Sequence, residues 1–121
     1  MVLFPGSQPP HMNYINTTTI EQLTRGQGAQ FLSRMTGAQI VFDDNRNAIR
    51  LAFSKQVGKA GAKFKTLEIQ YNSATDLYDI HAFKLNRQTF EVETKKQLDG
   101  IYCDQLQETC QNLTGLYFTL R

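Results

Sequence analysis

Apolar and polar positions alternate with a period of two through the middle of this chain. The pattern is clearest where Ile49, Leu51 and Phe53 are separated by Arg50 and Ala52. Short stretches with this period, bounded by turn-forming residues, predict β-strands. The sequence predicts five strands in this way, at residues 39–42, 48–53, 64–71, 77–85 and 90–95. Most connections between them are short and rich in Asn, Asp and Ser, which favours an antiparallel meander of about five strands.

The segment before the strands changes to helical spacing. Thr18 and Glu21 stand at the spacing of a capping box, so we expect a short first helix to begin at Thr18. Gly26 and Gly28 predict a break at residues 25–27, because glycine is unfavourable within a helix. A second helix is then expected over residues 28–36, and Gly37 can end it in the left-handed conformation.

The segment after the strands is also helical in its spacing, over residues 100–113. Asp99 is the expected N-cap, and Thr114 and Gly115 are the expected end. The side chains expected to share its buried stripe are Tyr102, Leu106, Cys110 and Leu113. The order of elements therefore predicts an α+β fold, an antiparallel meander sheet whose apolar face is covered by the N-terminal and C-terminal helices.

A length of 121 residues fits one domain, which we place at residues 13–121. Residues 1–12 contain Gly, Ser and three Pro and stand apart from the periodic pattern. Two interpretations of them stay open, a disordered tail or a cloning scar before a native start at Met12. They have neither the basic start nor the long apolar stretch of a secretory signal.

Cysteine usage and hydropathy bear on the compartment. Cys103 and Cys110 are seven residues apart in a predicted helix, about 10 Å along its axis. A disulfide requires Cα atoms within about 7 Å, so we expect free thiols and a reducing compartment such as the cytoplasm. No apolar run is long enough to span a membrane.

The sequence offers little for catalysis or metal binding. His81 is the only histidine after residue 12, and the cysteines fall on or beside an apolar helical stripe, where a buried thiol is inert. No His or Cys pair has the spacing of a zinc site. We therefore expect a protein that is not an enzyme and that has no catalytic residues, metal or cofactor.

The densest charge lies between residues 46 and 65, which hold six basic residues and no acid. These candidate phosphate contacts are Arg46, Arg50, Lys55, Lys59, Lys63 and Lys65. Nonspecific nucleic-acid binding rests on phosphate neutralisation and counterion release, and exposed aromatic rings can stack bases. Tyr71 and Tyr78, on either side of a turn, are the stacking candidates.

Residues 54–63 connect two of the predicted strands as a loop of about ten residues, longer than most hairpin loops. Its Gly58 and Gly61 lack the spacing and the following helix of a phosphate-binding loop. Two interpretations remain for its lysines, a contact with nucleic-acid backbone or a solvated loop that discourages aggregation.

A role in binding a host protein is the alternative to nucleic-acid binding. Tyr14, Tyr102, Tyr117 and Phe118 are aromatic residues that could anchor a protein interface, although Tyr102 fits a core position better.

Three stretches resemble a family of small uncharacterised proteins from bacteriophages and prophages. They are residues 31–38 (FLSRMTGA), residues 76–79 (DLYD), and residues 100–106 (GIYCDQL) with residues 114–117 (TGLY). The resemblance covers residues 18–120 and departs at residues 26–28, where the family has adjacent glycines. It implies a viral or mobile-element origin and a place in the host cytoplasm, but no activity. The partner would be nucleic acid or a host protein of defence or replication.

Overall fold

A five-stranded antiparallel sheet organises the computed structural model, which describes residues 13–119. The two interpretations of residues 1–12 lie outside that range. The strands follow one another across the sheet in chain order: β1 (Ala38–Asp43), β2 (Ala48–Val57), β3 (Phe64–Asn72), β4 (Leu77–Leu85) and β5 (Val92–Ile101). The helices are α1 (Tyr14–Thr24), α2 (Ala29–Thr36) and α3 (Cys103–Thr114). The α+β meander expected from the alternation is therefore confirmed.

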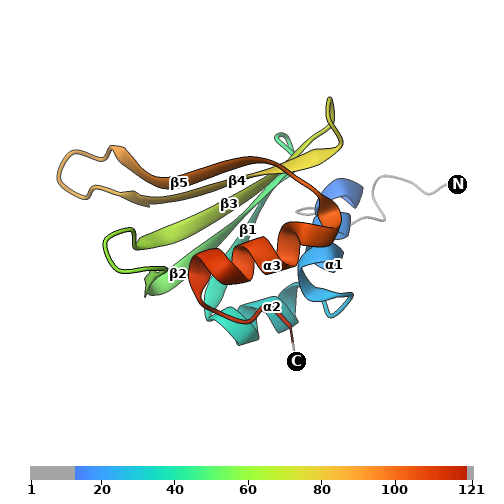
Figure 1. Ribbon diagram of the computed structural model, residues 1–121, viewed down its shortest axis with the longest axis horizontal. Helices are drawn as coiled ribbons and strands as arrows, with labels where there is room; N and C mark the ends of the chain where they lie inside the picture. Colours follow the sequence, from blue (N-terminus) through green and yellow to red (C-terminus); the bar gives the residue numbers. More distant parts are fainter. Residues whose placement is uncertain (1–12, 120–121) are drawn as a thin grey trace, which may run out of the picture.

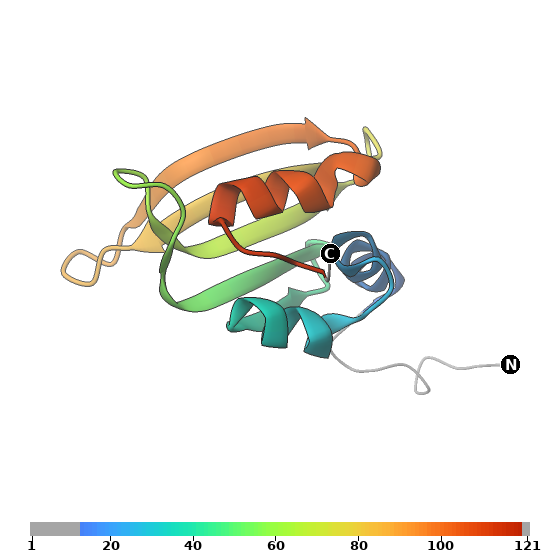
Figure 2. The same ribbon diagram turned by 60° about the horizontal axis from the view of Figure 1, so that its bottom comes forward.

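All three helices lie on one side of the curved sheet (Figures 1 and 2). The register explains why this side is apolar, since Ile49 pairs with Ile69 and Ile69 pairs with Ile80. Side chains in the same row of neighbouring strands point to the same face. The helices bury this face with Leu23 of α1, Leu32 of α2 and several residues of α3. No helix within residues 13–119 is long and apolar enough to cross a membrane.

The first helix begins earlier than its capping box predicts. Asn13 is the N-cap, and its side-chain oxygen accepts a hydrogen bond from the Asn16 amide at 2.7 Å. Thr18 lies inside the helix and donates to the Tyr14 carbonyl, so its predicted capping role is wrong. The Asn13 amide group also donates to Asn47, which ties the start of α1 to the β1–β2 turn. This contact between distant segments selects the earlier start.

The break between the first two helices and the end of the second are confirmed. Arg25 ends α1 in the left-handed conformation, and α2 starts directly after Gly28. Gly37 ends α2 with φ 73°, and its amide donates to the Ser33 carbonyl at 2.8 Å. Glycine enters this conformation without the steric cost that a Cβ brings.

The connection between β2 and β3 is shorter than the sequence suggests. β2 continues past Phe53 to Val57, which pairs with Phe64, and the register shifts between Ala52 and Val57. This irregularity hides the strand from a simple period-two pattern. The loop that remains spans residues 58–63, and the Gly58 amide donates to the Thr114 carbonyl at the end of α3 at 3.2 Å.

The fifth strand is longer than expected, and the last helix starts later. Leu98 and Ile101 pair with β4, so residues up to 101 belong to the sheet. The N-cap of α3 is Tyr102 and not Asp99. Tyr102 is 60% exposed, which corrects its expected place in the core.

The cysteines separate into two environments. Both thiols are free, Cys103 is exposed in the first turn of α3, and Cys110 is buried in the core. Burial raises the pKa of the Cys110 thiol far above its ordinary value. The buried stripe is therefore confirmed at Cys110 and Leu106. Phe118 is completely buried, so the segment after α3 packs into the core.

Gly37→Val should lower the free energy of unfolding by about 1–3 kcal/mol, through backbone strain in the left-handed conformation. A Cβ at this position would meet no atom within 4 Å, so steric overlap does not contribute. Urea denaturation measures the loss. Gly37→Asn is the matched control and should lose less, because Asn tolerates this conformation better. Equal stability of Gly37→Val and the parent protein would refute the assigned helix end.

Candidate nucleic-acid interface

The meander brings two hairpins together at one end of the sheet. Because Thr66 near the start of β3 pairs with Phe83 near the end of β4, the β2–β3 loop lies beside the β4–β5 hairpin. Both project beyond the helices, on the left in Figure 1. We call the cations of these two hairpins the basic end: Lys55, Lys59, Lys63, Lys65, Lys84, Arg87, Lys95 and Lys96.

The basic end concentrates the positive charge of the protein. It holds eight of the chain's thirteen lysine and arginine residues, while only two of the eleven acids, Glu91 and Glu93, lie in the same segments. Within residues 13–119, the one ion pair at this end joins Lys95 to Glu93, with Nζ and Oε1 3.7 Å apart. No other cation of the basic end forms an ion pair with an acid among the described residues, although Glu93 stands opposite Lys84 in the register of β4 and β5.

The two hairpins contribute cations to shared hollows. One hollow of about 690 Å³ has Lys65 of β3, Lys84 of β4 and Arg87 of the β4–β5 turn in its lining. A smaller hollow of about 280 Å³ is lined by Lys59 of the β2–β3 loop together with Lys95 and Lys96 of β5. Side chains far apart in the sequence therefore face the same spaces.

The tip of the β4–β5 hairpin presents an aromatic ring. Phe90 is 75% exposed and has φ 60°, an uncommon conformation for a bulky residue. Its amide donates to the Asn86 carbonyl at 2.6 Å, and the Asn86 side chain accepts from the amides of Gln88 and Thr89. The turn is thus held by its own hydrogen bonds. An exposed ring beside several cations is the composition found in proteins that bind single-stranded nucleic acid.

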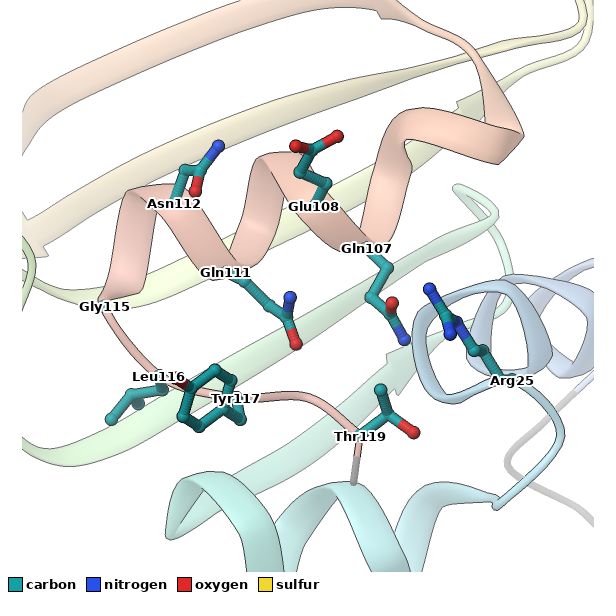
Figure 3. Close-up of a pocket in the computed structure, with 9 residues that line it drawn as sticks. All are labelled: Arg25, Gln107, Glu108, Gln111, Asn112, Gly115, Leu116, Tyr117 and Thr119. Atoms are coloured by element: carbon teal, nitrogen blue, oxygen red, sulfur yellow. The ribbon is translucent and has the colours of Figure 1, made fainter. Parts of the chain in front are cut away.

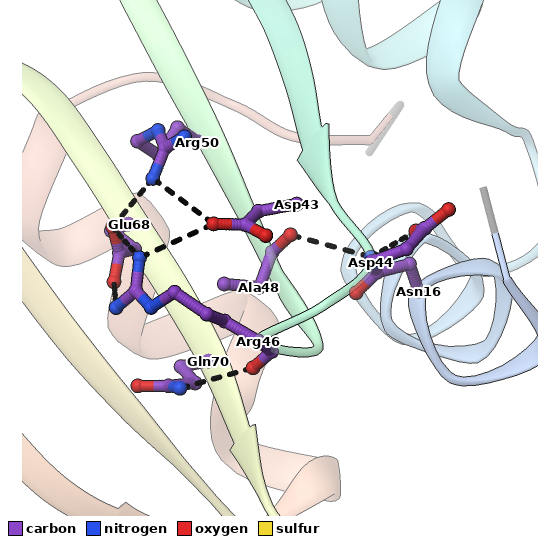
Figure 4. A network of polar contacts seen from close by, with 8 residues as sticks. All are labelled: Asn16, Asp43, Asp44, Arg46, Ala48, Arg50, Glu68 and Gln70. Carbon is purple, nitrogen blue, oxygen red and sulfur yellow. Dashed lines mark hydrogen bonds and ion pairs between the residues drawn. The ribbon is translucent and has the colours of Figure 1, made fainter. Parts of the chain in front are cut away.

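Arg46 and Arg50 are not available to phosphate in the way the sequence suggests. Arg46 donates to Glu68 at 2.7 Å, Arg50 donates to Glu68 at 3.2 Å, and both also lie within 4 Å of the Asp43 carboxylate (Figure 4). The basic run at residues 46–65 therefore divides into two arginines that are paired with acids and four lysines that belong to the basic end. The acids come from other strands, so the sequence run alone did not reveal the pairing.

Glu68 is the centre of this network. Burial opposes ionisation of its carboxyl group, but the hydrogen bonds and charges of Arg46 and Arg50 outweigh burial, so the pKa of Glu68 lies below its ordinary value. The hydrogen bond to Glu68 raises the pKa of Arg46. The network therefore holds a nearly buried carboxylate in its charged form on the face of the sheet opposite the helices.

Tyr71 and Tyr78 do not form a pair of exposed rings. Tyr78 is 4% exposed, and its hydroxyl lies 3.3 Å from the Thr19 hydroxyl of α1. Tyr71 packs edge-on against Tyr78, with 5.6 Å between ring centroids, and its hydroxyl donates to Asp76. Both rings lie on the side of the sheet that faces the helices, so the predicted stacking role of Tyr78 is wrong.

His81 lies on the opposite face of the sheet. Its Nε2 is 2.7 Å from the Thr94 hydroxyl, and its ring lies against Phe83 with centroids 4.7 Å apart. His81 is thus in contact with a side chain of β5 and with a second side chain of its own strand. No group of three metal-ligating side chains occurs within residues 13–119.

A third hollow, of about 720 Å³, lies between α3 and the segment that follows it (Figure 3). Its lining is polar, but two of its amide side chains already hold the fold together. Gln107 donates to the Leu23 carbonyl at 2.9 Å, and Gln111 accepts from the Phe118 amide at 2.8 Å. We therefore interpret this hollow as a consequence of how the C-terminal segment packs against α3, and not as a binding site.

The cations of β4 and β5 did not stand out in the sequence. Lys84, Arg87, Lys95 and Lys96 are interleaved with acids and lie far from the dense run. The meander topology predicts that these cations lie near the β2–β3 loop, because alternate connections of a meander lie at the same end of the sheet.

No protein-family model, curated protein sequence or solved structure matches this chain.

Glu68→Gln should destabilise the protein by about 1–3 kcal/mol at neutral pH, because both arginines lose a charged hydrogen-bond acceptor. The pKa of Glu68 is lowered in the folded state, so its contribution is full above the ordinary value of 4.5 and is lost as the pH falls through the folded pKa. Urea denaturation at a series of pH values should therefore show the two proteins converging in acid. Glu21→Gln, an exposed carboxyl on α1, is the control and should show no such convergence. A stability difference that stays constant with pH would contradict the network.

Proposed function

We propose that this protein is a non-enzymatic nucleic-acid-binding protein whose basic end contacts the phosphate backbone. The observation that carries the proposal is the eight cations on two adjacent hairpins, of which only Lys95 is paired with an acid among the described residues. Burying such a surface against a neutral partner would leave many charges desolvated. The phosphates of a nucleic acid instead supply negative charges along an extended chain, which can contact the cations of both hairpins.

The composition of the basic end favours binding that is independent of sequence. Seven of its eight cations are lysines, which act as compact charges on flexible stems. Recognition of a base edge usually relies on the two parallel hydrogen bonds of an arginine or an amide side chain. The gain in free energy therefore comes mainly from counterion release.

A phage or mobile-element origin, with the host cytoplasm as the place of action, is part of this proposal. It rests on the sequence resemblance and agrees with an accessory protein that acts by binding.

Binding to a host protein is the second candidate function, and the hairpin tip favours it. Leu85 and Val92 pair across the β4–β5 hairpin, and both are exposed together with Phe90. Exposed apolar side chains gathered at one place mark interaction sites. A protein partner would bury these three side chains, and its affinity would depend on them more than on the lysines.

Replacement of Lys55, Lys63, Lys84 and Arg87 by Ala should weaken binding to oligonucleotides and flatten its salt dependence. Each lost phosphate contact lowers the slope of log K against log salt by about 0.7 for a single strand and about 0.9 for a duplex. Four contacts therefore remove about 3 from the slope. Fluorescence anisotropy between about 50 and 200 mM salt measures it.

Two single variants provide the matched control. Arg87→Ala and Arg34→Ala each remove one exposed arginine, but Arg34 lies on α2 and belongs to neither of the two hairpins. Arg87→Ala should lower the slope by about one contact, and Arg34→Ala should leave it unchanged. Absence of binding by the parent protein at about 50 mM salt would refute the proposed function. Salt-independent capture of one host protein that is lost in Phe90→Ala would favour the second candidate.

A further inference from the structure

The smaller hollow at the basic end is a cavity with an apolar floor and a cationic rim. Phe64, Leu98 and Leu113 line it from β3, β5 and α3, and the cations of its rim are Lys59, Lys95 and Lys96. Its volume of about 280 Å³ is at the lower limit of cavities that hold small ligands. It is suited to a single ring system rather than to an extended molecule.

The β2–β3 loop forms one wall of this cavity and is fixed in place. The Gly58 amide donates to the Thr114 carbonyl, and the Ala62 amide donates to the Lys59 carbonyl at 3.0 Å. A Cβ at Gly58 would stand 2.9 Å from the Phe64 ring, so only glycine allows the loop to lie this close. The wall is therefore built into the fold, and Lys59 is carried on it.

The charges around the cavity orient what enters it. The last turns of α3 contribute Thr109 and Asn112, and the C-terminal end of a helix carries partial negative charge. An anionic group is therefore disfavoured at the floor and favoured at the lysine rim. The Thr109 hydroxyl donates to the Gln105 carbonyl, which leaves its oxygen free to accept a hydrogen bond. A ligand with an apolar ring that bears hydrogen-bonding groups, and with an anion attached, matches this arrangement.

We infer that the cavity receives one unpaired base of a nucleic-acid strand whose backbone runs over the basic end. This inference rests on the proposed function and specifies its substrate as single-stranded nucleic acid. The base would lie on the floor, with its phosphate among Lys59, Lys95 and Lys96. The cavity alone would also fit a small anion with one ring, but the five further cations of the basic end extend well beyond such a ligand.

The preference for a single strand follows from the cost of exposing a base. In a duplex the base is stacked and paired, and extruding it costs a few kcal/mol. In a single strand that cost is largely absent, so contact with the floor adds directly to the electrostatic attraction. Phe90 at the hairpin tip offers a second ring on which the same strand could stack.

Ala62→Leu tests the inference, because it fills the cavity without removing a charge. Ala62 lines the cavity, whereas Ala60 is exposed in the same loop and does not line it. Ala62→Leu should weaken binding of a single-stranded oligonucleotide about tenfold, the scale of one lost base contact, and leave the salt slope unchanged. Ala60→Leu should stay within about twofold of the parent protein, as surface substitutions usually do.

Two further measurements complete the test. The parent protein should bind the single strand more tightly than its duplex, and a 2-aminopurine base in the strand should change its fluorescence on binding, less so with Ala62→Leu. The inference would be overturned if Ala62→Leu and Ala60→Leu weakened binding equally, or if the protein bound strand and duplex with equal affinity. The proposed function would survive either result as long as binding depended on salt. Absence of all binding by the parent protein at about 50 mM salt would overturn both.

Discussion

Burial of a single face of the sheet is the constraint on which the rest of this structure depends. The period-two alternation places Ile49, Ile69 and Ile80 in one row, and a row of this kind is stable only when other elements exclude water from it. Burial of one such side chain contributes about 1.5–3 kcal/mol. All three helices are used to cover this face (Figure 2). None of the three helices described covers the opposite face of the sheet or the tips of the two hairpins.

The charged side chains that the helices do not cover fall into two groups. In the first, Glu68 is held between Arg46 and Arg50, so a nearly buried carboxylate and its partners satisfy one another. In the second, the basic end gathers cations for which the described residues supply almost no acids. The first arrangement is complete within the fold, whereas the second gains most from an external polyanion. This contrast separates structural cations from candidate binding cations.

Much of the fold could be predicted from the sequence, but the site could be predicted only in part. Strand order and the helix end at Gly37 follow from local patterns, and the structure has both. The start of α1 at Asn13 and the extension of β5 depend on contacts between distant segments, which local patterns do not contain. The same reason explains the site, because charge density along the chain could not show that Glu68 neutralises Arg46 or that β5 adds lysines to the β2–β3 loop.

The most direct test of this account is a titration of the protein with a single-stranded oligonucleotide, followed by backbone amide NMR. The account predicts that chemical shifts change at residues 55–65 and 84–96, with the largest changes near Lys59 and Lys96. It also predicts little change at Arg46 and Arg50, because these two cations are already paired with the two carboxylates of Glu68 and Asp43. Shift changes centred on these arginines, or no changes at residues 55–65 and 84–96, would contradict it.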